Sequence, residues 1–247
     1  MSKATIVIPN INGKGWLKDS IESIYAQTEQ DFDLIVVDNG STDESLEQAR
    51  SYCTRPNFTL IENGRNTGFS YAVNQGIARA QSKYVVLFNN DAFAEPDWLA
   101  ELIKTADADP KIFAVSSLML RYYEPELADD AGDYVTILGF ACKRGDGLKA
   151  SRYTKPCRVF SACGGAALYR KSILDEIGVF DELFFAYYED VVFASSESAR
   201  LSTVSASMPS NSVVSPVSLL YKNAFVAVAK RMLFPSMEST ARVTAAG

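Results

Sequence analysis

Residues 32–43, FDLIVVDNGSTD, decide the fold of this chain. The stretch begins with residues 32–37, a mostly apolar run rich in β-branched side chains, which is typical of a buried strand. A polar turn sequence, DNG, comes next. Ser41 and Glu44 then have the spacing of a capping box, which predicts that a helix starts there. A strand, a polar turn and a helix in this order form the repeating unit of α/β folds.

The same alternation of strand and helix patterns extends on both sides of this stretch. Strands are expected at residues 4–8, 58–61, 84–88, 112–119 and 163–169, and helices at residues 17–25, 69–80, 97–105 and 171–176. Residues 121–155 show no steady period and are long for a bare loop, so we expect short strands and a mobile flap there. This order predicts an α/β fold, with a mixed, mainly parallel sheet flanked by helices.

The composition disfavours several classes of protein. The chain has 247 residues and neither a run of about 18 apolar residues nor a signal-peptide pattern, so we expect a cytoplasmic protein without a transmembrane helix. Its net charge of −6 argues against general binding of nucleic acid. The four cysteines lack metal-site spacing, so they are expected to be free thiols. Because the chain has no histidine, histidine-ligated zinc and catalysis by a histidine base are excluded.

Three polar motifs follow predicted strands, at residues 9–12 (PNIN), 38–43 (DNGSTD) and 89–91 (NND). Each alone is compatible with an ordinary turn. Together they are expected to meet, because ligands of open α/β sheets bind at the carboxyl ends of the strands. Asn89 and Asp91 are two residues apart on an extended segment, so their oxygens could hold a hard divalent cation. The chain has no G-x-G-x-x-G after the first strand and no P-loop, which disfavours dinucleotide and P-loop enzymes.

A second group of motifs lies near the end of the patterned region. Residues 184–190, FFAYYED, place aromatic rings beside an acidic pair, which suits a site that stacks on a sugar and removes a hydroxyl proton. The alternative is a buried aromatic strand that ends in an acidic turn. Gly164 and Gly165 either let a substrate approach the backbone closely or form a tight turn.

Taken together, these residues resemble glycosyltransferase family 2, whose members are inverting enzymes with the GT-A fold, a Rossmann-like α/β fold. The matching strings run in family order over residues 4–194 and include IVIPNING, DFDLIVVDNGSTD, LFNND, CGGAALYR and GVFDELFFAYYED. The NND form of the metal motif and the DDAGD string at residues 129–133 are most similar to the rhamnosyltransferase-like branch.

The resemblance implies a role for each matching residue. For the nucleotide it implies Asp38 at the nucleobase, surrounded by Pro9, Asn10, Asn66, Gly68, Asn74 and Asn90. For a divalent metal, Mn²⁺ or Mg²⁺, it implies Asp91 and Asn89. For catalysis it implies Asp190 as the base and Glu189 as its neighbour. For the acceptor it implies Gly164, Gly165, Phe184 and Tyr187.

The function that the resemblance implies is transfer of a sugar, with inversion, from a nucleoside-diphosphate sugar such as dTDP-rhamnose. The acceptor is a hydroxyl group of a glycan or a lipid-linked glycan, so a peripheral contact at the inner face of the membrane is expected. One alternative is a nucleotide-binding protein of the same fold that has lost turnover through an altered tail. A sugar nucleotidyltransferase would need a glycine-rich, basic phosphate loop near residues 8–15, where only Lys14 is basic. A purely structural protein would leave the ordered motifs unexplained.

The chain departs from the family after about residue 194, so we expect a glycosyltransferase domain at residues 1–194 and an atypical tail at residues 195–247. Residues 195–218 contain ten serines and no helical stripe, which predicts poor order. Suitable codons for residues 194–203, shifted by one base, spell LRRSRLGYRL, so we hypothesise a frameshifted tail that lacks the family histidine; the coding DNA tests this. Residues 222–234 are expected to form a basic, apolar helix, packed on the sheet or lying on a membrane surface.

Overall fold

The computed structural model describes residues 1–136, 138, 140–194 and 225–234. The strands are β1 (Ala4–Asn10), β2 (Phe32–Asp38), β3 (Phe58–Glu62), β4 (Tyr84–Phe88), β5 (Phe93–Ala94), β6 (Ile112–Arg121), β7 (Ala128–Asp130), β8 (Asp133–Val135), β9 (Ala141–Lys143), β10 (Ala166–Arg170) and β11 (Phe225–Phe234). The helices are α1 (Leu17–Tyr25), α2 (Ser45–Arg50), α3 (Phe69–Arg79), α4 (Trp98–Asp107) and α5 (Lys171–Ile177), with a 3-10 turn at η1 (Ala150–Arg152). Residues 189–194 are also helical.

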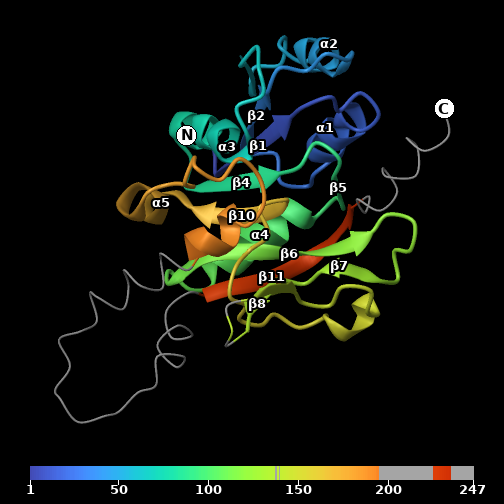
Figure 1. The fold of residues 1–247 in the computed structure, drawn as a ribbon, viewed down its shortest axis with the longest axis vertical. Coiled ribbons are helices and arrows are strands. Elements are labelled where there is room, and N and C mark those ends of the chain that lie inside the picture. Colours follow the sequence, from blue (N-terminus) through green and yellow to red (C-terminus); the bar gives the residue numbers. More distant parts are fainter. Residues whose placement is uncertain (137, 139, 195–224, 235–247) are drawn as a thin grey trace.

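The main sheet has the strand order β3-β2-β1-β4-β10-β6-β11-β5 within the described residues, and β7 pairs with β6 (Figure 1). Strands β1 to β4 are parallel, whereas β10 runs antiparallel to both β4 and β6. The predicted α/β fold with a mixed, mainly parallel sheet is therefore confirmed. In the parallel register Asn10 lies opposite Asp38, so the ends of β1 and β2 present their polar residues together.

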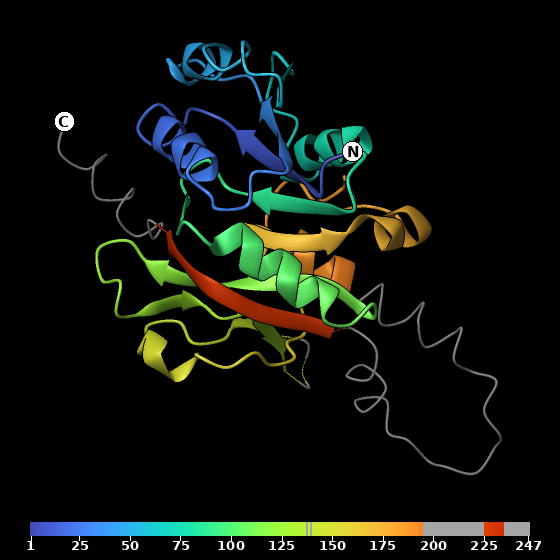
Figure 2. The same ribbon diagram turned by 180° about the vertical axis from the view of Figure 1, so that it is seen from behind.

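Apolar side chains of the central strands alternate between two buried layers. Ile6 and Ile8 pack with α1 and α4 on one face of the sheet, and Val7 packs with α3 and α5 on the other. Figure 2 shows α4 lying across the face that is turned away in Figure 1. Helix α1 carries the predicted apolar stripe, and its Leu17, Ile21 and Ile24 are fully buried. This α/β/α arrangement leaves the carboxyl ends of the strands open to ligands.

The helix predicted to start at Ser41 begins four residues later, at Ser45. The Ser41 hydroxyl does not cap the helix but donates a hydrogen bond to the Asp38 carboxylate. Ser41 therefore belongs to the turn after β2, because serine bonds locally to a turn as readily as to a helix N-terminus.

The helix predicted at residues 222–234 is wrong, since residues 225–234 form strand β11. Its backbone pairs in parallel with β6 and antiparallel with β5, and both figures show it beside β6. In the run FVAVA, β-branched valine alternates with other residues, which favours a strand. The edge of β6 carries N–H and C=O groups that a neighbouring strand can pair with, whereas a helix cannot. The predicted disorder of residues 195–218 lies outside the described residues, and the frameshift and the boundary at residue 194 stay predictions.

Three further expectations concern the cysteines, membrane-spanning helices and residues 121–155. The four cysteines are free thiols, as predicted. In the part of the chain that the structure describes, no helix combines the length and apolar character needed to cross a bilayer. The irregular segment at residues 121–155 contains the short strands β7, β8 and β9, which confirms that part of the prediction.

Candidate active site

Asn10, Asp38 and Asn90 meet in one hydrogen-bond network at the carboxyl end of the sheet. The Asn10 amide donates to Asp38 Oδ1 at 2.9 Å, and Asn10 Oδ1 accepts from Asn90 at 2.8 Å. Asp38 is only 1% exposed, and its Oδ2 accepts from the Gly40 and Ser41 amides. The network therefore joins the turns after β1, β2 and β4. A nucleobase that contacts Asp38 has to replace one of these donors.

A second network involves Asn39, which the sequence analysis did not select. Its side chain donates to Asn66 Oδ1 at 3.0 Å and to the Gly68 carbonyl at 3.1 Å. Its Oδ1 accepts from the Thr67 hydroxyl at 2.7 Å and from Asn63 at 3.2 Å. Asn39 thus holds the loop that contains Asn66 and Gly68 against the end of β2. The sequence feature that could have identified Asn39 is its position in the DNG turn, next to Asp38.

Gly68 and Asn74 connect α3 to residues 180–188 and so to the acidic pair. Gly68 has a φ of +89°, and a Cβ there would lie 2.7 Å from the carbonyl oxygen of Phe185. The next amide, of Phe69, donates to that same carbonyl at 2.6 Å. The Asn74 side chain donates to the Phe180 carbonyl at 2.8 Å and accepts from its amide at 3.2 Å. In this structure Asn74 therefore positions the segment that leads to Glu189.

Asn89 and Asp91 follow β4, as predicted, but the extended segment predicted for them is wrong. Residues 90 and 91 form a turn, in which the Ala92 amide donates to the Asn89 carbonyl at 3.2 Å. Burial raises the pKa of Asp91 to about 6, and the nearby charge of Asp129 adds to the rise. Its Oδ1 is buried and has no hydrogen-bond partner among the described residues. A buried carboxylate oxygen without a donor, two residues along the chain from the Asn89 amide, fits a hard divalent cation. The described residues contain no group of three or more carboxylate or cysteine side chains placed to hold a metal, so a cation here would need further ligands.

Glu189 and Asp190 lie at the start of the helical residues 189–194, beside the CGG turn. The Gly164 amide donates to Asp190 Oδ2 at 3.0 Å, and the Val191 amide donates to its Oδ1 at 2.7 Å. Burial nevertheless raises the pKa of Asp190. Burial also raises the pKa of Glu189 to about 7, with the charge of Asp190 as the second cause. Gly164 thus orients the predicted base, which is more basic than a free carboxylate.

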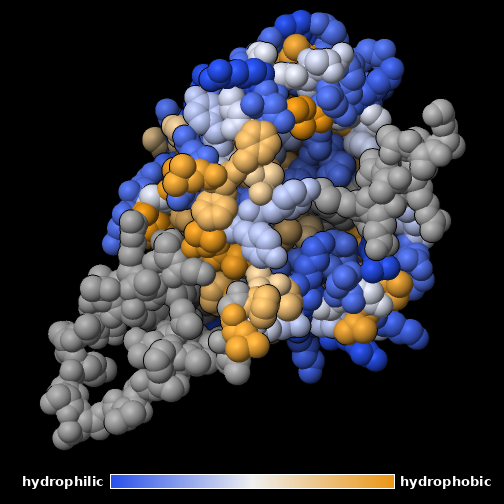
Figure 3. All heavy atoms as spheres, viewed as in Figure 1, coloured by the Kyte–Doolittle hydropathy of each residue, from blue (hydrophilic) through white to orange (hydrophobic). Residues whose placement is uncertain are grey.

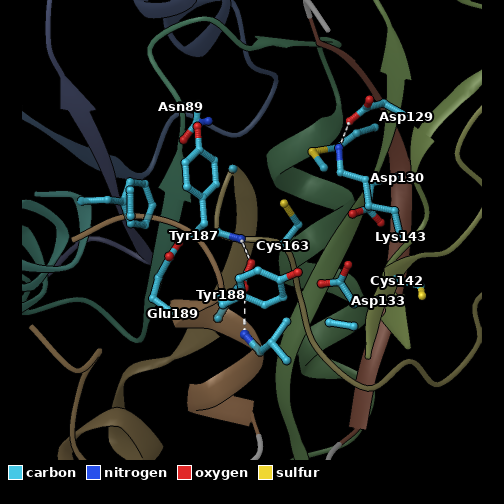
Figure 4. A pocket seen from close by; sticks show the side chains of 18 residues that line it. Asn89, Asp129, Asp130, Asp133, Cys142, Lys143, Cys163, Tyr187, Tyr188 and Glu189 are labelled. Carbon is cyan, nitrogen blue, oxygen red and sulfur yellow. Dashed lines mark hydrogen bonds and ion pairs between the residues drawn. The ribbon is translucent and has the colours of Figure 1, made fainter. Parts of the chain in front are cut away.

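A cavity of about 550 Å³ connects these groups, a size in the range of small-molecule sites. Its lining includes the predicted residues Asn89, Gly164, Gly165, Tyr187, Glu189 and Asp190. In Figure 4 Asn89, Tyr187 and Glu189 lie on one side of the cavity, and Tyr188 lies nearer its middle. Phe184 is half-buried and does not line the cavity. The structure therefore brings Asn89 to the same cavity as Glu189 and Asp190, whereas Asp91 does not line it. The Asn10–Asp38 network is joined to this segment through Asn90.

The opposite side of the cavity consists of residues that the sequence analysis left without a role. Figure 4 shows Asp129, Asp130, Asp133 and Lys143 there, and we call these four residues the acidic wall. They come from β7, β8 and β9, and Lys143 Nζ pairs with Asp129 Oδ2 at 3.0 Å. Burial raises the pKa of Asp130 well above its usual range and that of Asp133 to about 6. The sequence contains the DDAGD string, but only the fold shows that the string faces Asp190.

Three of the four aromatic residues before the acidic pair are exposed and Phe184 is half-buried, so they do not form the buried strand that was the alternative. Tyr187 and Tyr188 are 64% and 61% exposed and have φ values of +70° and +65°, in the left-handed region that non-glycine residues rarely adopt. On this face of the molecule, apolar side chains gather in the middle, next to polar ones (Figure 3). Both tyrosines also line the cavity, so their exposed rings lie where the cavity meets solvent.

The raised pKa of Glu189 predicts a pH-dependent stability. A carboxyl group whose pKa rises on folding stabilises the protein below its unfolded-state pKa, and this contribution is lost as the pH rises through the folded pKa. Burial sets the folded pKa of Glu189 at about 7. We therefore expect the stability of Glu189→Gln relative to wild type to increase as the pH rises from about 4.5 to about 7, by on the order of 1 kcal/mol or more.

Denaturant unfolding at several pH values measures this difference. The exposed Glu176→Gln is the matched control and should show a constant difference from wild type. If the difference for Glu189→Gln also stays constant with pH, the raised pKa is wrong.

Comparison with known proteins identifies the family. The profile of glycosyl transferase family 2 matches residues 5–178. An uncharacterized glycosyltransferase of Rickettsia bellii is 25% identical over 175 residues, which are 71% of this chain and 24% of that protein. The cholesterol galactosyltransferase of Borreliella burgdorferi is 33% identical over 107 residues, 43% of this chain and 30% of that protein. The chain thus spans less than a third of the length of these curated relatives.

A solved structure supports the fold. The crystal structure of GalNAc-T7 with UDP, GalNAc and Mn²⁺ aligns with a TM-score of 0.71 and 14% identity, over 96% of this chain and 44% of that one. This likeness shows the GT-A fold, in agreement with the mixed sheet and its flanking helices. Because the family profile covers most of the chain, the conclusion from sequence and fold together is that this protein belongs to glycosyl transferase family 2.

Proposed function

We propose that this chain transfers a sugar from a nucleoside-diphosphate sugar to a hydroxyl group of a glycan or lipid-linked acceptor, with inversion at the anomeric carbon. The observation that carries the proposal is the position of Asp190. Its carboxylate lines the cavity and is held by the Gly164 and Val191 amides, and its pKa is raised by burial. A fixed carboxylate of raised basicity at a substrate-sized cavity is suited to general-base catalysis.

Asp190 removes the proton of the acceptor hydroxyl group while the acceptor oxygen attacks the anomeric carbon. The new bond joins that oxygen to the carbon, and the bond from the carbon to the diphosphate oxygen breaks. The proton stays on Asp190, and the electron pair leaves with the nucleoside diphosphate. Attack from the side opposite the leaving group inverts the configuration. Glu189, which is 7% exposed, lies beside the base, and its charge would oppose ionisation of Asp190.

The nucleotide end of the site comprises the networks around Asp38 and Asn39. Pro9 at the end of β1, Asn66 and Gly68 in the loop before α3, and the Asn10–Asn90 pair surround the same region. Asp38 contacts the nucleobase after one of its internal donors gives way. Asn74 supports this end indirectly, through the Phe180 backbone.

A divalent cation, Mn²⁺ or Mg²⁺, fits the unpartnered Asp91 oxygen and the Asn89 side chain. The GalNAc-T7 structure that shares the fold contains Mn²⁺ together with UDP. When bound, the cation supplies positive charge for the diphosphate, which lowers the cost of its departure. The donor that we propose is dTDP-rhamnose, on the strength of the NND and DDAGD strings. Tyr187, with Gly164 and Gly165, receives the acceptor.

A thermal-shift panel tests this function. We expect UDP or dTDP to raise the Tm in the presence of Mn²⁺ and to raise it less without the metal, because only the folded state binds the ligand. GDP measures the specificity for the base. Hydrolysis of the cognate sugar nucleotide is then measured beside calorimetric binding of the nucleotide. Binding without turnover would identify a nucleotide-binding protein, and no shift with any nucleotide would contradict the proposal.

A further inference from the structure

The acidic wall is the part of the cavity that the proposed function does not use. Its residues face Asp190, since the charge of Asp190 is one of the causes that raise the pKa of Asp133. Ser161 fixes Asp133 by donating a hydrogen bond to its Oδ2 at 2.8 Å. We propose that the acidic wall binds the acceptor sugar and selects a neutral pyranose through its hydroxyl groups. The inference rests on the proposed function and names the substrate class for the same site.

Two buried oxygens accept no hydrogen bond from an amide, ammonium or alcohol group, so the cavity is built for hydrogen-bond donors. Asp130 is completely buried, and apart from the neighbouring carboxyl group of Asp133 its Oδ2 has no hydrogen-bond partner among the described residues. Glu189, which reaches the cavity from a different segment, is 7% exposed, and its Oε2 has no partner there either. A buried polar atom without a partner is costly, so native proteins rarely keep one without a reason. Both residues line the cavity, and the hydroxyl groups of a bound ligand would supply the missing donors.

Lys143 provides the complementary donor. Its ammonium group carries three N–H donors, and the ion pair with Asp129 uses one of them. The side chain is about half exposed and lines the cavity, so its other donors can reach a ligand oxygen. A sugar hydroxyl group both donates and accepts. Adjacent hydroxyls can therefore donate to Asp130 or Asp133 while accepting from Lys143.

The charged groups that line the cavity disfavour sugars that carry a charge of their own. The cavity is lined by five carboxyl groups and one ammonium group, which disfavours an anionic sugar such as a uronic acid. An amino sugar with its ammonium group at Asp130 would set that group near the Lys143 ammonium, whose charge reaches Asp130, and burial also opposes ionisation of Asp130. A neutral hydroxyl group forms a hydrogen bond with either state of the carboxyl group. The neutral pyranose is thus the class that this wall suits best.

The test uses simple glycosides as probes, with wild type in the presence of UDP and Mn²⁺. Saturation-transfer NMR titrations compare three neutral probes, methyl β-D-glucopyranoside, methyl β-D-galactopyranoside and methyl α-D-mannopyranoside, with methyl β-D-glucuronide and methyl β-D-glucosaminide. We expect at least one neutral glycoside to bind more tightly than the glucuronide and the glucosaminide. Calorimetric binding of UDP is measured in parallel and reports the nucleotide end of the site.

Two variants remove the two kinds of contact. Asp130→Leu removes the acceptor oxygens at similar size, and Lys143→Met removes the donor while keeping the stem. Each is expected to weaken the neutral glycoside about tenfold and to leave UDP affinity unchanged. Asp146→Asn, an exposed substitution in the same segment, is the control and should change neither. Lys143→Met, whose side chain is half exposed, carries the test if Asp130→Leu does not fold.

The outcomes separate the two proposals. The inference is overturned if wild type binds UDP but no neutral glycoside, if the charged glycosides bind more tightly, or if both variants bind like wild type. Glycoside binding that depends on Asp130 and Lys143, without any nucleotide binding, would support the inference and contradict the proposed function.

Discussion

Asp190→Asn is expected to abolish sugar transfer while nucleotide binding remains nearly unchanged. An amide of the same size cannot take up the proton of the acceptor hydroxyl group. A general base contributes about a hundred- to ten-thousand-fold to the rate, so we expect a loss in kcat of that order. The effect falls on kcat because the nucleotide networks around Asp38 and Asn39 do not include Asp190.

The environment of Asp190 shows how to interpret this variant. Both carboxylate oxygens accept backbone N–H groups, from Gly164 and Val191. An asparagine can accept only one of these bonds well, because its amide nitrogen is itself a donor. The Tm is therefore measured together with kcat and with calorimetric nucleotide binding, and the exposed Asp175→Asn is the matched control. Transfer at the wild-type rate by a folded Asp190→Asn protein would remove Asp190 from the mechanism.

Asp91→Ala is expected to remove the metal dependence of nucleotide binding. Asn89 and Asn90 are neutral, so Asp91 is the one carboxylate of the NND motif, and little charge would remain to hold a divalent cation. The ratio of UDP affinities with and without Mn²⁺ should fall to about one. Asp91→Asn keeps an oxygen ligand without the charge, so it should fall between wild type and Asp91→Ala.

The same substitution separates binding from folding. Asp91 Oδ1 is buried without a partner, and burial raises the pKa of the group to about 6. Removing an unpartnered buried carboxyl group should leave the stability of the metal-free protein unchanged or higher. A stable variant without metal-dependent binding is the expected result. Equal UDP affinity of wild type with and without Mn²⁺ would show that Asp91 has no metal-binding role.

Local patterns in the sequence determined most of the α/β core. The stripe of Leu17, Ile21 and Ile24 predicted α1, and the apolar run at residues 84–88 predicted β4. Both predictions are correct because these patterns depend on the few residues that share one face of an element. The capping box at Ser41 failed because a serine side chain can serve a turn or a helix, and Asp38, three residues earlier in the same turn, is within reach of the Ser41 hydroxyl.

Only the tertiary structure shows which segments face each other across the cavity. The sequence contained DDAGD, the glycine pair and the acidic pair, and it predicted that Asn89, Asp91 and Asp190 act together. It could not show that Asp130 and Lys143 face Asp190, because residues 128–143 and 189–194 are far apart in the sequence and come together at the cavity only in the fold. It also predicted a helix where β11 pairs with β6, since an open strand edge is not visible in a local pattern. Burial, unpartnered oxygens and raised pKa values arise from such distant contacts, and these properties, rather than residue types, turn the motifs into a site.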